Sequence, residues 1–206
     1  MKYLIGIDEV GRGPLAGPVV VSAAAIPKNF KISQRILGKL KDSKQLSKKQ
    51  REEWYRYFVA EKRISFSVAR IYPLQIDRTN ISKSANKAAF LAYHRLLERN
   101  KAFKNHQVLL DGGLYLKNKK ESGEVYSAKT IIKGDEKHLP IMIASIVAKV
   151  IRDRYMVRLA KEYPQYGFEN HKGYGTREHR KALEKIGPSD VHRLTFIRKY
   201  TTMSLK

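Results

Sequence analysis

The chain has 206 residues, of which 42% are hydrophobic and 30% are charged. A chain of this size and composition buries one large core or two small ones, which excludes a wholly disordered or fibrous polypeptide. Lysine and arginine number 42 against 19 acidic residues, so the formal net charge is +23. This excess favours a polyanionic partner, nucleic acid before any other, while a generically basic surface is the alternative that charge alone leaves open.

The same sequence disfavours membrane association. The longest apolar run, residues 19–26, is interrupted by Ser22 and is far shorter than the roughly 20 residues that a spanning helix needs. The N-terminal residues turn charged at Asp8, where a secretory signal would still be apolar, and cysteine is absent. We therefore expect a cytoplasmic protein with no membrane contact, and a monomer.

Two buried strands are predicted at the start of the chain. Residues 3–7 form a short apolar run, and residues 18–26 are rich in β-branched residues and alanine. Residues 11–17 connect the two strands. The polar and basic residues 28–44 that follow are predicted to be mainly loop.

A helix and a third strand are predicted next. Ser47 and Gln50 have the spacing of a capping box, which opens a helix at this point. The apolar face of this helix is formed by Trp54, Phe58 and Val59. Residues 64–71 alternate between apolar and polar, which predicts a strand.

The clearest amphipathic helix of the sequence begins after Asn80. Its apolar residues recur at helical spacing, at Ala85, Ala88, Ala89, Ala92 and Leu96. Asn100 stands where a left-handed residue would end this helix. Residues 108–110 and 130–132 are then predicted to be short strands, joined by a polar connection whose residues 117–123 are expected to form a surface turn.

The last third of the chain is predicted to be helical with one long loop. Pro140 opens a buried helix that runs to about residue 161. Residues 163–175 are a loop rich in glycine and aromatic residues, after which Thr176 caps a short basic helix that stops at Gly187. The basic tail is only weakly patterned. One compact αβ unit with a C-terminal extension is the simplest organisation.

Acidic residues follow three of the predicted strands, at Asp8, Glu9, Asp111 and Asp135. Strand ends of an open αβ sheet are where ligands gather, so these carboxylates are candidates for one site. Such a group of hard oxygen ligands suits Mg²⁺ or Mn²⁺, and a pair of these ions catalyses phosphoryl transfer. A single acid at a strand end is more often a turn former or a helix cap. Consecutive residues such as Asp8 and Glu9 also face opposite sides of a strand, unless it ends or twists there.

The glycine segment at 11–17 does not match a nucleotide-binding motif. A strand and not a helix follows it, Pro14 interrupts it, and the chain has no GxxxxGK[ST] motif. Glycines let a backbone approach a sugar-phosphate chain closely, and Arg12 adds a charged fork. A tight connection between two strands explains the segment equally well.

Several segments in order along most of the chain carry a family resemblance. They are GIDEVGRGPLAGPV at 6–19, DSKQLS at 42–47, VLLDG at 108–112, KGD at 133–135, ASIVAKVIRDR at 144–154 and PQYGFENHKGYGT at 164–176. Together they resemble type 2 ribonuclease H of the bacterial kind, the first and last motifs being the most specific. The resemblance implies an α/β ribonuclease H-like fold, with a mixed central sheet flanked by helices. It also implies a catalytic domain at 1–162 and a substrate-contacting C-terminal loop, helix and tail at 163–206, packed on that domain.

The resemblance also implies an activity. Type 2 ribonucleases H are endonucleases that cut the RNA strand of RNA/DNA hybrids and cut 5′ to a single ribonucleotide in duplex DNA, leaving 3′-hydroxyl and 5′-phosphate ends. Carried over by motif, the catalytic, metal-binding carboxylates are Asp8, Glu9, Asp111 and Asp135. These are the acids that follow the predicted strands.

The resemblance assigns substrate contacts to other residues. Contact with the ribonucleotide and its 2′-hydroxyl falls on Gly11, Arg12 and Gly13. Tyr174 packs on the neighbouring deoxyribose, where an extra hydroxyl would clash with the ring. Lys44 and Lys172 are candidates for phosphate contacts, although for any one lysine of so basic a chain a solvated role is the commoner one.

Two other functions are weighed against this one. A type 3 ribonuclease H, or another nuclease on the same fold, would act on hybrids and leave single ribonucleotides uncut. A non-catalytic RNA-binding protein would use the carboxylates for structure alone. Nearby, Asp153 is expected to pair with Lys149 along one helix and not to bind metal, and His171 is expected to be a polar loop residue.

Overall fold

The computed structural model describes residues 2–33, 37, 38, 40–100, 103, 105–116 and 128–201. Its centre is a five-stranded sheet in the order β3-β2-β1-β4-β5. The strands are β1 (Tyr3–Val10), β2 (Val19–Pro27), β3 (Ser65–Ile71), β4 (His106–Asp111) and β5 (Ala128–Ile131). β1, β2 and β3 pair antiparallel, whereas β1, β4 and β5 run parallel. The expected mixed sheet is therefore confirmed.

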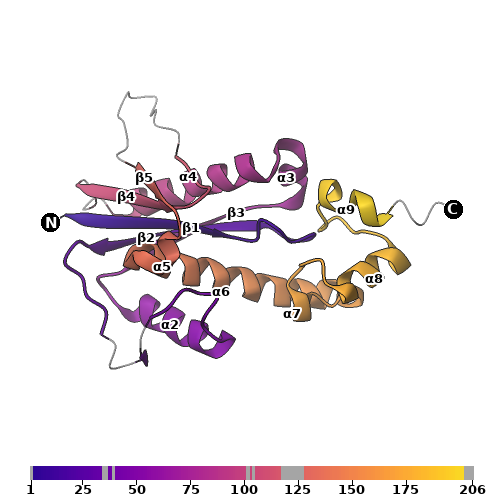
Figure 1. The fold of residues 1–206 in the computed structure, drawn as a ribbon, viewed down its shortest axis with the longest axis horizontal. Helices are drawn as coiled ribbons and strands as arrows, with labels where there is room; N and C mark the ends of the chain where they lie inside the picture. The colour runs from indigo at the N-terminus through magenta and orange to yellow at the C-terminus, as the bar shows by residue number, and fades with distance from the viewer. Residues whose placement is uncertain are drawn as a thin grey trace.

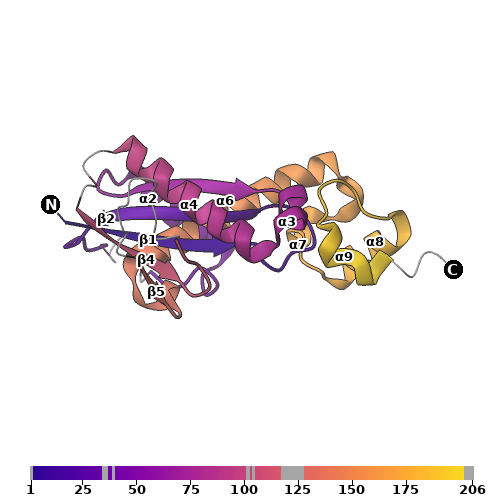
Figure 2. The same ribbon diagram turned by 90° about the horizontal axis from the view of Figure 1, so that it is seen from above.

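Helices cover both faces of this sheet and continue beyond it. The longer ones are α2 (Lys48–Ala60), α4 (Ile81–Arg99) and α6 (Leu139–Glu162). The shorter ones are α3 (Pro73–Thr79), α5 (Gly134–Lys137), η2 (Pro164–Tyr166), α7 (Phe168–His171), α8 (Arg177–Ile186) and α9 (Leu194–Thr201). In Figure 1, α4 lies on one side of the sheet and α6 with α2 on the other, while α7, α8 and α9 gather at one end. Figure 2 shows the same C-terminal group extending past the strands.

The sheet contributes alternate residues to two cores, as the period of a strand requires. On one face, Ala23 and Ala25 of β2 pack with the buried alanines of α4. On the other face, Ala24 and Ile26 pack with α6 and α2. A third core lies beyond the strands, where the last turns of α6 meet the C-terminal helices. Because α6 takes part in two of these cores, it links the sheet to the C-terminal group.

The sequence signals at the helix ends are mostly confirmed. Both halves of the capping box at Ser47 and Gln50 are formed. Asn80 caps α4 by accepting a hydrogen bond from the Lys83 N–H at 2.9 Å, and Thr176 caps α8 with the N–H of His179. Among the described helices, none combines the length and apolarity needed to cross a bilayer.

Several local predictions are wrong. Asn100 does end α4, but its φ of −146° is extended and not left-handed. Val59 is 60% exposed, so α2 buries only Trp54 and Phe58. The weakly patterned tail contains a helix that the sequence did not indicate, since residues 194–201 form α9. The surface turn expected at 117–123 lies outside the described residues.

Candidate active site

Three carboxylates meet at one edge of the sheet. Ile7 of β1 and Leu110 of β4 form the last pair of their parallel ladder, so Asp8 and Asp111 follow side by side. β1 itself continues to Val10, three residues beyond the predicted end of the first strand. Asp135 reaches the same place from α5, a single turn just after β5. Carboxylate oxygens of these three residues all lie within 4.8 Å of one another. The predicted convergence of acids at strand ends is therefore present for Asp8, Asp111 and Asp135.

The surroundings of Asp8 disfavour its charged form. Burial raises the pKa of Asp8 well above its ordinary value, and the charges of Glu9 and Asp111 raise it further. A hydrogen bond from the Ser145 hydroxyl of α6 acts in the opposite direction. Asp111 is held by the backbone, since its Oδ1 accepts the N–H of Gly134 at 2.7 Å. The cluster therefore concentrates negative charge that the protein neutralises only in part.

Glu9 leaves β1 on the other face of the sheet. The strand neither ends nor breaks between Asp8 and Glu9, because both stay in the antiparallel ladder with β2. Burial raises the pKa of Glu9 to about 7; the nearby Arg12 opposes that rise and Asp111 adds to it. Glu9 Oε2 is buried and has no hydrogen-bond partner among the described residues. Glu9 thus lies outside the group of three but within the electrostatic reach of Asp111.

These four residues fit a divalent cation. All their donor atoms are carboxylate oxygens, which Mg²⁺ and Mn²⁺ prefer. The raised pKa values of Asp8 and Glu9 indicate repulsion and burial that a bound cation would relieve. The unpartnered Glu9 Oε2 is one further oxygen available to such an ion. Asp8, Asp111 and Asp135 would hold the ion, with Glu9 beside them.

The segment at 42–44 borders this cluster. Lys44 Nζ lies 3.3 Å from Asp135 Oδ2, although the Lys44 side chain is 81% exposed. Partial burial lowers the pKa of Lys44, but Asp135 and Asp42 outweigh it and the net shift is upward. Asp42, which the sequence reasoning did not select, is buried and accepts the Lys44 N–H at 3.2 Å. The DSK motif at 42–44 is the sequence signal that could have indicated Asp42.

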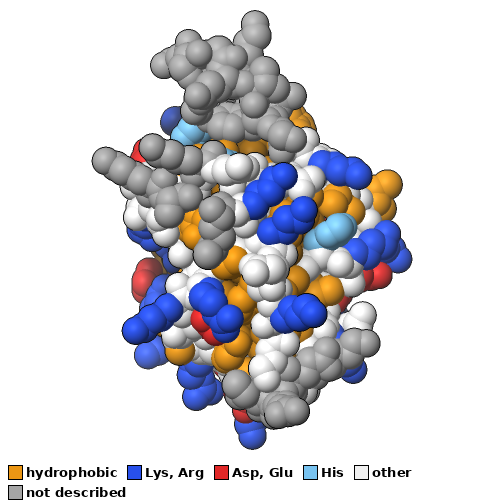
Figure 3. Space-filling view, turned by 90° about the vertical axis from the view of Figure 1, so that its left-hand side faces the viewer, with side chains coloured by type: hydrophobic (Ala, Val, Ile, Leu, Met, Phe, Trp, Pro, Cys, Tyr) orange, Lys and Arg blue, Asp and Glu red, His pale blue; other side chains and the backbone are white. Residues whose placement is uncertain are grey.

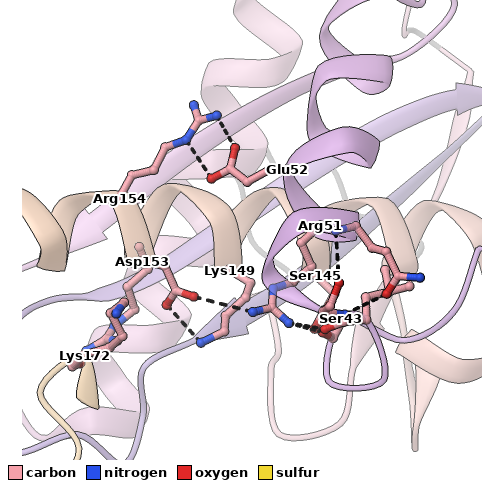
Figure 4. A network of polar contacts seen from close by, with 12 residues as sticks. Ser43, Arg51, Glu52, Ser145, Lys149, Asp153, Arg154 and Lys172 are labelled. Atoms are coloured by element: carbon pink, nitrogen blue, oxygen red, sulfur yellow. Dashed lines mark hydrogen bonds and ion pairs between the residues drawn. The ribbon is translucent and has the colours of Figure 1, made fainter. Parts of the chain in front are cut away.

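A chain of hydroxyl groups connects this segment with the carboxylates. Ser43 Oγ and Ser145 Oγ lie 2.8 Å apart, and Ser145 also hydrogen bonds to Asp8. Figure 4 shows Ser43 and Ser145 beside Arg51, which donates to the Ser43 carbonyl at 3.0 Å. Sequence reasoning missed Ser145, because its partners come from distant parts of the chain. Ser145 therefore belongs to the surroundings of Asp8.

The expected pair on α6 is confirmed. Lys149 Nζ donates to Asp153 Oδ1 at 2.9 Å, and Arg51 lies on the other side of the same carboxylate, 3.9 Å away. In Figure 4, dashed lines join the Asp153 carboxylate to both cations, and Lys172 lies nearby. Asp153 does not belong to the carboxylate group. It neutralises cations next to the site.

The glycine segment lies beside Glu9. The φ of Gly11 is +89°, a left-handed value that favours glycine. A methyl group at Gly13 would meet no atom within 4 Å, so this residue faces open space. The Arg12 guanidinium lies 3.6 Å from Glu9 Oε1 and donates to Ser82 of α4 at 3.0 Å. The segment therefore adjoins the carboxylates and offers an open backbone.

The loop that carries Tyr174 contacts the glycine segment directly. The N–H groups of Leu15 and Ala16 both donate to the Gly173 carbonyl, at 2.8 and 3.4 Å. The Tyr174 side chain is 39% exposed. Lys172 has a left-handed φ of 53°, and its Nζ donates to the Glu169 carbonyl. Burial lowers the pKa of Lys172. Two motifs far apart in the sequence thus form one surface.

His171 is a core residue and not a polar loop residue. It is 8% exposed and stacks on His179 with ring centroids 4.5 Å apart. His179 Nε2 lies 3.0 Å from His192 Nε2. Burial is the main cause that lowers the pKa of both His179 and His192 to about 4. The three rings therefore pack the base of the Tyr174 loop, with His179 and His192 neutral, and the prediction that His171 is a polar loop residue is wrong.

Comparison with known proteins agrees with this geometry. A sequence model of the family described as Ribonuclease HII matches residues 5–199. The chain belongs to the ribonuclease HII family. The ribonuclease HII of Caldicellulosiruptor bescii is 41% identical to it over 96% of this chain and 87% of that protein. The solved ribonuclease H2 of Pyrococcus horikoshii OT3 has a TM-score of 0.78 at 27% identity and covers 99% of each chain.

A more distant structure shares the fold. Bst-RNase HIII, solved in complex with Mn²⁺, has a TM-score of 0.74 at 18% identity over 98% of this chain and 70% of that one. Ribonucleases HII are metal-dependent endoribonucleases, so the chain is a hydrolase that acts on RNA/DNA hybrids. Family membership also decides against a non-catalytic RNA-binding protein.

Proposed function

We propose that this ribonuclease HII hydrolyses the phosphodiester on the 5′ side of a ribonucleotide, both in hybrids and at a single ribonucleotide in duplex DNA. One observation carries the proposal. The carboxylate cluster, the glycine segment and the Tyr174 loop adjoin one another. The groups proposed to cleave the strand therefore lie next to the groups proposed to recognise the sugar. Such an arrangement supports cutting at one chosen nucleotide.

The proposed catalytic residues are Asp8, Glu9, Asp111 and Asp135. They bind the divalent ions, and both Mg²⁺ and Mn²⁺ suit their oxygen donors. When two such ions are bound, they supply activation of the attacking water and neutralisation of the leaving oxygen. The hydrogen bond from Ser145 favours the ionised form of Asp8 and opposes the effect of burial, and Lys44 orients Asp135. The products are a 3′-hydroxyl and a 5′-phosphate, and no covalent enzyme intermediate is required.

The proposed substrate contacts are those of the glycine segment and the Tyr174 loop. Only a 2′-hydroxyl distinguishes a ribonucleotide at one position, so its sensor must hydrogen bond to that group at close range. Gly11, Arg12 and Gly13 provide this contact, and Gly13 faces open space where a sugar can approach the backbone. The half-exposed ring of Tyr174 then packs on the next sugar. Lys44 and Lys172 contact phosphates and position the duplex.

Further assignments rest on the same site. Catalysis is assigned to residues 1–162, which hold the carboxylates, and part of substrate contact to the segment from residue 163, which holds Lys172 and Tyr174. The enzyme is proposed to act as a monomer. Excision of ribonucleotides from DNA places the enzyme in replication and repair, in the cytoplasm.

Cleavage-site mapping tests the proposal. A duplex with one ribonucleotide and a uniform hybrid are each incubated with the wild type and with Tyr174→Ala, in Mg²⁺, in Mn²⁺ or in a chelator. We expect one cut 5′ to the single ribonucleotide, dependent on metal, and a loss in Tyr174→Ala that is larger on this duplex than on the hybrid. Cleavage of the hybrid alone by the wild type would instead indicate the type 3 specificity.

A further inference from the structure

Two arginines are fully buried under the glycine segment. Arg152 of α6 and Arg193, which precedes α9, both have an exposed fraction of 0%. Neither forms an ion pair with a carboxylate among the described residues, whose ion pairs involve other arginines. A buried guanidinium group destabilises the folded state unless partners compensate for the lost hydration. Burial accordingly lowers the pKa of both, that of Arg193 to about 9.

Backbone carbonyls take the place of a carboxylate partner. Arg193 donates to the carbonyl of Gly11 at 2.6 Å, to that of Arg12 at 2.9 Å and to that of Gly17 at 2.9 and 3.0 Å. Arg152 donates to the carbonyls of Pro18, Ala16 and Lys172, at 3.0, 3.2 and 3.0 Å. The planar fork of arginine suits such divided donation, because its N–H groups point in fixed directions. Together these two side chains hold nearly the whole connection between β1 and β2.

This arrangement fixes which side of the glycine segment is free. In a trans peptide, the N–H points away from the carbonyl of the same peptide group. Since the carbonyls of Gly11 and Arg12 face Arg193, the N–H groups of Arg12 and Gly13 point away from it. Neither N–H has an acceptor among the described residues. Two donors are thus presented together on the open side of the segment.

Arg152 also connects the two recognition segments. The same guanidinium binds the glycine segment through Ala16 and Pro18 and the Tyr174 loop through Lys172. It lies 5.7 Å from the centroid of the Tyr174 ring. The contact with the glycine segment is tight, because a methyl group at Gly11 would lie 2.3 Å from Arg152 Nε. The position of the Tyr174 ring relative to the glycine segment is therefore set in part by Arg152.

We propose that Arg152 and Arg193 are positioning residues for ribonucleotide recognition, which hold the glycine segment and the Tyr174 loop in the arrangement that reads a single ribonucleotide. They touch neither the substrate nor the metal ligands and act through the backbone that they bind. The inference rests on the proposed function and adds to it the residues that preorganise its specificity.

Arginine-to-lysine variants test this proposal. Arg193→Lys and Arg152→Lys keep the positive charge but lose the fork that serves several carbonyls at once. Arg154→Lys is the matched control, since Arg154 also lies on α6 but is exposed and pairs with Glu52. For each variant, kcat/KM is measured on a duplex with one ribonucleotide and on a uniform hybrid, and folding is followed by circular dichroism.

We expect each positioning variant to lose about tenfold or more of kcat/KM on the single-ribonucleotide duplex relative to its loss on the hybrid, as one misplaced recognition element costs roughly this much. Arg154→Lys should keep the wild-type ratio. Equal losses on both substrates in a folded variant, or no loss, would overturn the inference while leaving the proposed function in place. Failure of the wild type to cut the single-ribonucleotide duplex would overturn the proposed function itself.

Amide hydrogen exchange of the unaltered protein provides a second test that needs no variant to fold. In a chelator, so that no cleavage occurs, the amides of Arg12 and Gly13 should exchange fast in the free protein. They should become protected by a duplex with one ribonucleotide and less so by an all-DNA duplex. Protection in the free protein, or the same protection by both duplexes, would contradict the proposed orientation of the segment.

Discussion

At the scale of one residue, substitution of Asp135 separates the effect on catalysis from the effect on substrate binding. It is buried in the carboxylate group, and among the residues that the structure describes its cationic contact is the exposed Lys44. Asp135→Asn keeps the shape of the side chain but removes one charged metal ligand. We expect kcat to fall by roughly 10³-fold or more, as for a group that acts in the transition state. Affinity for a hybrid should change by less than about threefold, because a carboxylate does not attract phosphates.

Single-turnover cleavage and fluorescence anisotropy measure the two quantities separately. Asp190→Asn is a suitable control, since Asp190 is exposed and bonds to Tyr163 outside the carboxylate group. A parallel loss of affinity in Asp135→Asn would assign this residue a structural role.

The raised pKa of Glu9 predicts how the unfolding free energy changes with pH. In the folded protein without metal, its pKa is about 7 against an ordinary 4.5, mainly because of burial. Between these values the folded state holds a proton that the unfolded state has lost. The contribution of this proton to the unfolding free energy is fully present below pH 4.5 and is lost as pH rises through 7. Glu9→Gln cannot ionise, so its advantage in unfolding free energy over the wild type should grow by about 3 kcal/mol across this window.

Urea unfolding of both proteins in a chelator, from pH 4.5 to 8, measures this difference. Comparison with the variant cancels groups that do not interact with Glu9, including His179 and His192. The pKa values of these histidines are lowered to about 4, so their contribution has the opposite sign and is lost as pH falls from 6.5 through 4. A difference between Glu9→Gln and wild type that does not depend on pH would show that Glu9 ionises normally.

At the scale of elements, the close approach of β1 and α6 places Ser145 beside Asp8. A methyl group added at Gly6 of β1 would lie 2.1 Å from the Pro140 carbonyl carbon and 2.3 Å from the Ile141 nitrogen. Both neighbours are backbone atoms of the first turn of α6, so neither yields without moving the helix. We expect Gly6→Ala to lower the unfolding free energy by about 3 kcal/mol or more, as severe overpacking does.

Gly112→Ala is the matched control for this prediction. Its added methyl group would meet its nearest atom at 3.7 Å, an ordinary contact, so the loss should stay below about 1 kcal/mol. Urea unfolding of the two variants gives the comparison. Equal stability of Gly6→Ala and wild type would show that α6 shifts without cost.

Elements with a long period or a clear cap are predicted from the sequence. The alanine stripe of α4 is buried as expected, and Asn80 and Ser47 cap their helices. The convergence of Asp8 with Asp111 also follows from sequence, because parallel strands bring their carboxyl ends to one edge. These features depend on local pattern or on a general rule of topology.

Features that depend on tertiary contact are not predicted. α3 has only 7 residues, too few to show a period. Asp42 and Ser145 acquire their places next to Asp135 and Asp8 only when distant segments meet. Arg152 and Arg193 are the extreme case, because arginine is almost always exposed and its burial here depends on backbone carbonyls over a hundred residues away in the chain. Sequence patterns carry no record of such partners.

At the scale of the whole molecule, the positive charge is spread beyond the site. The face in Figure 3, at the end of the molecule away from the C-terminal helices, also carries many more Lys and Arg than acidic side chains. With a net charge of +23, nucleic acid is attracted to surfaces away from the site as well, and the acidic cluster receives it only if local contacts fix the duplex. The overall charge therefore brings nucleic acid to the protein, and the site residues fix where the duplex binds.

Salt dependence separates these two contributions. Each phosphate that a bound lysine neutralises makes the slope of log affinity against log salt more negative by about 0.9 for duplex DNA, because counterions are released. For the inactive Asp135→Asn protein on a duplex with one ribonucleotide, Lys172→Gln should make the slope shallower by about 1. Lys62→Gln should leave it unchanged, because Lys62 lies with Tyr3 and Phe103 near the start of β1, at the far end from the carboxylates. An equal change in both variants, measured by anisotropy at several salt concentrations, would mean that the duplex is held by diffuse charge and that Lys172 contacts no particular phosphate.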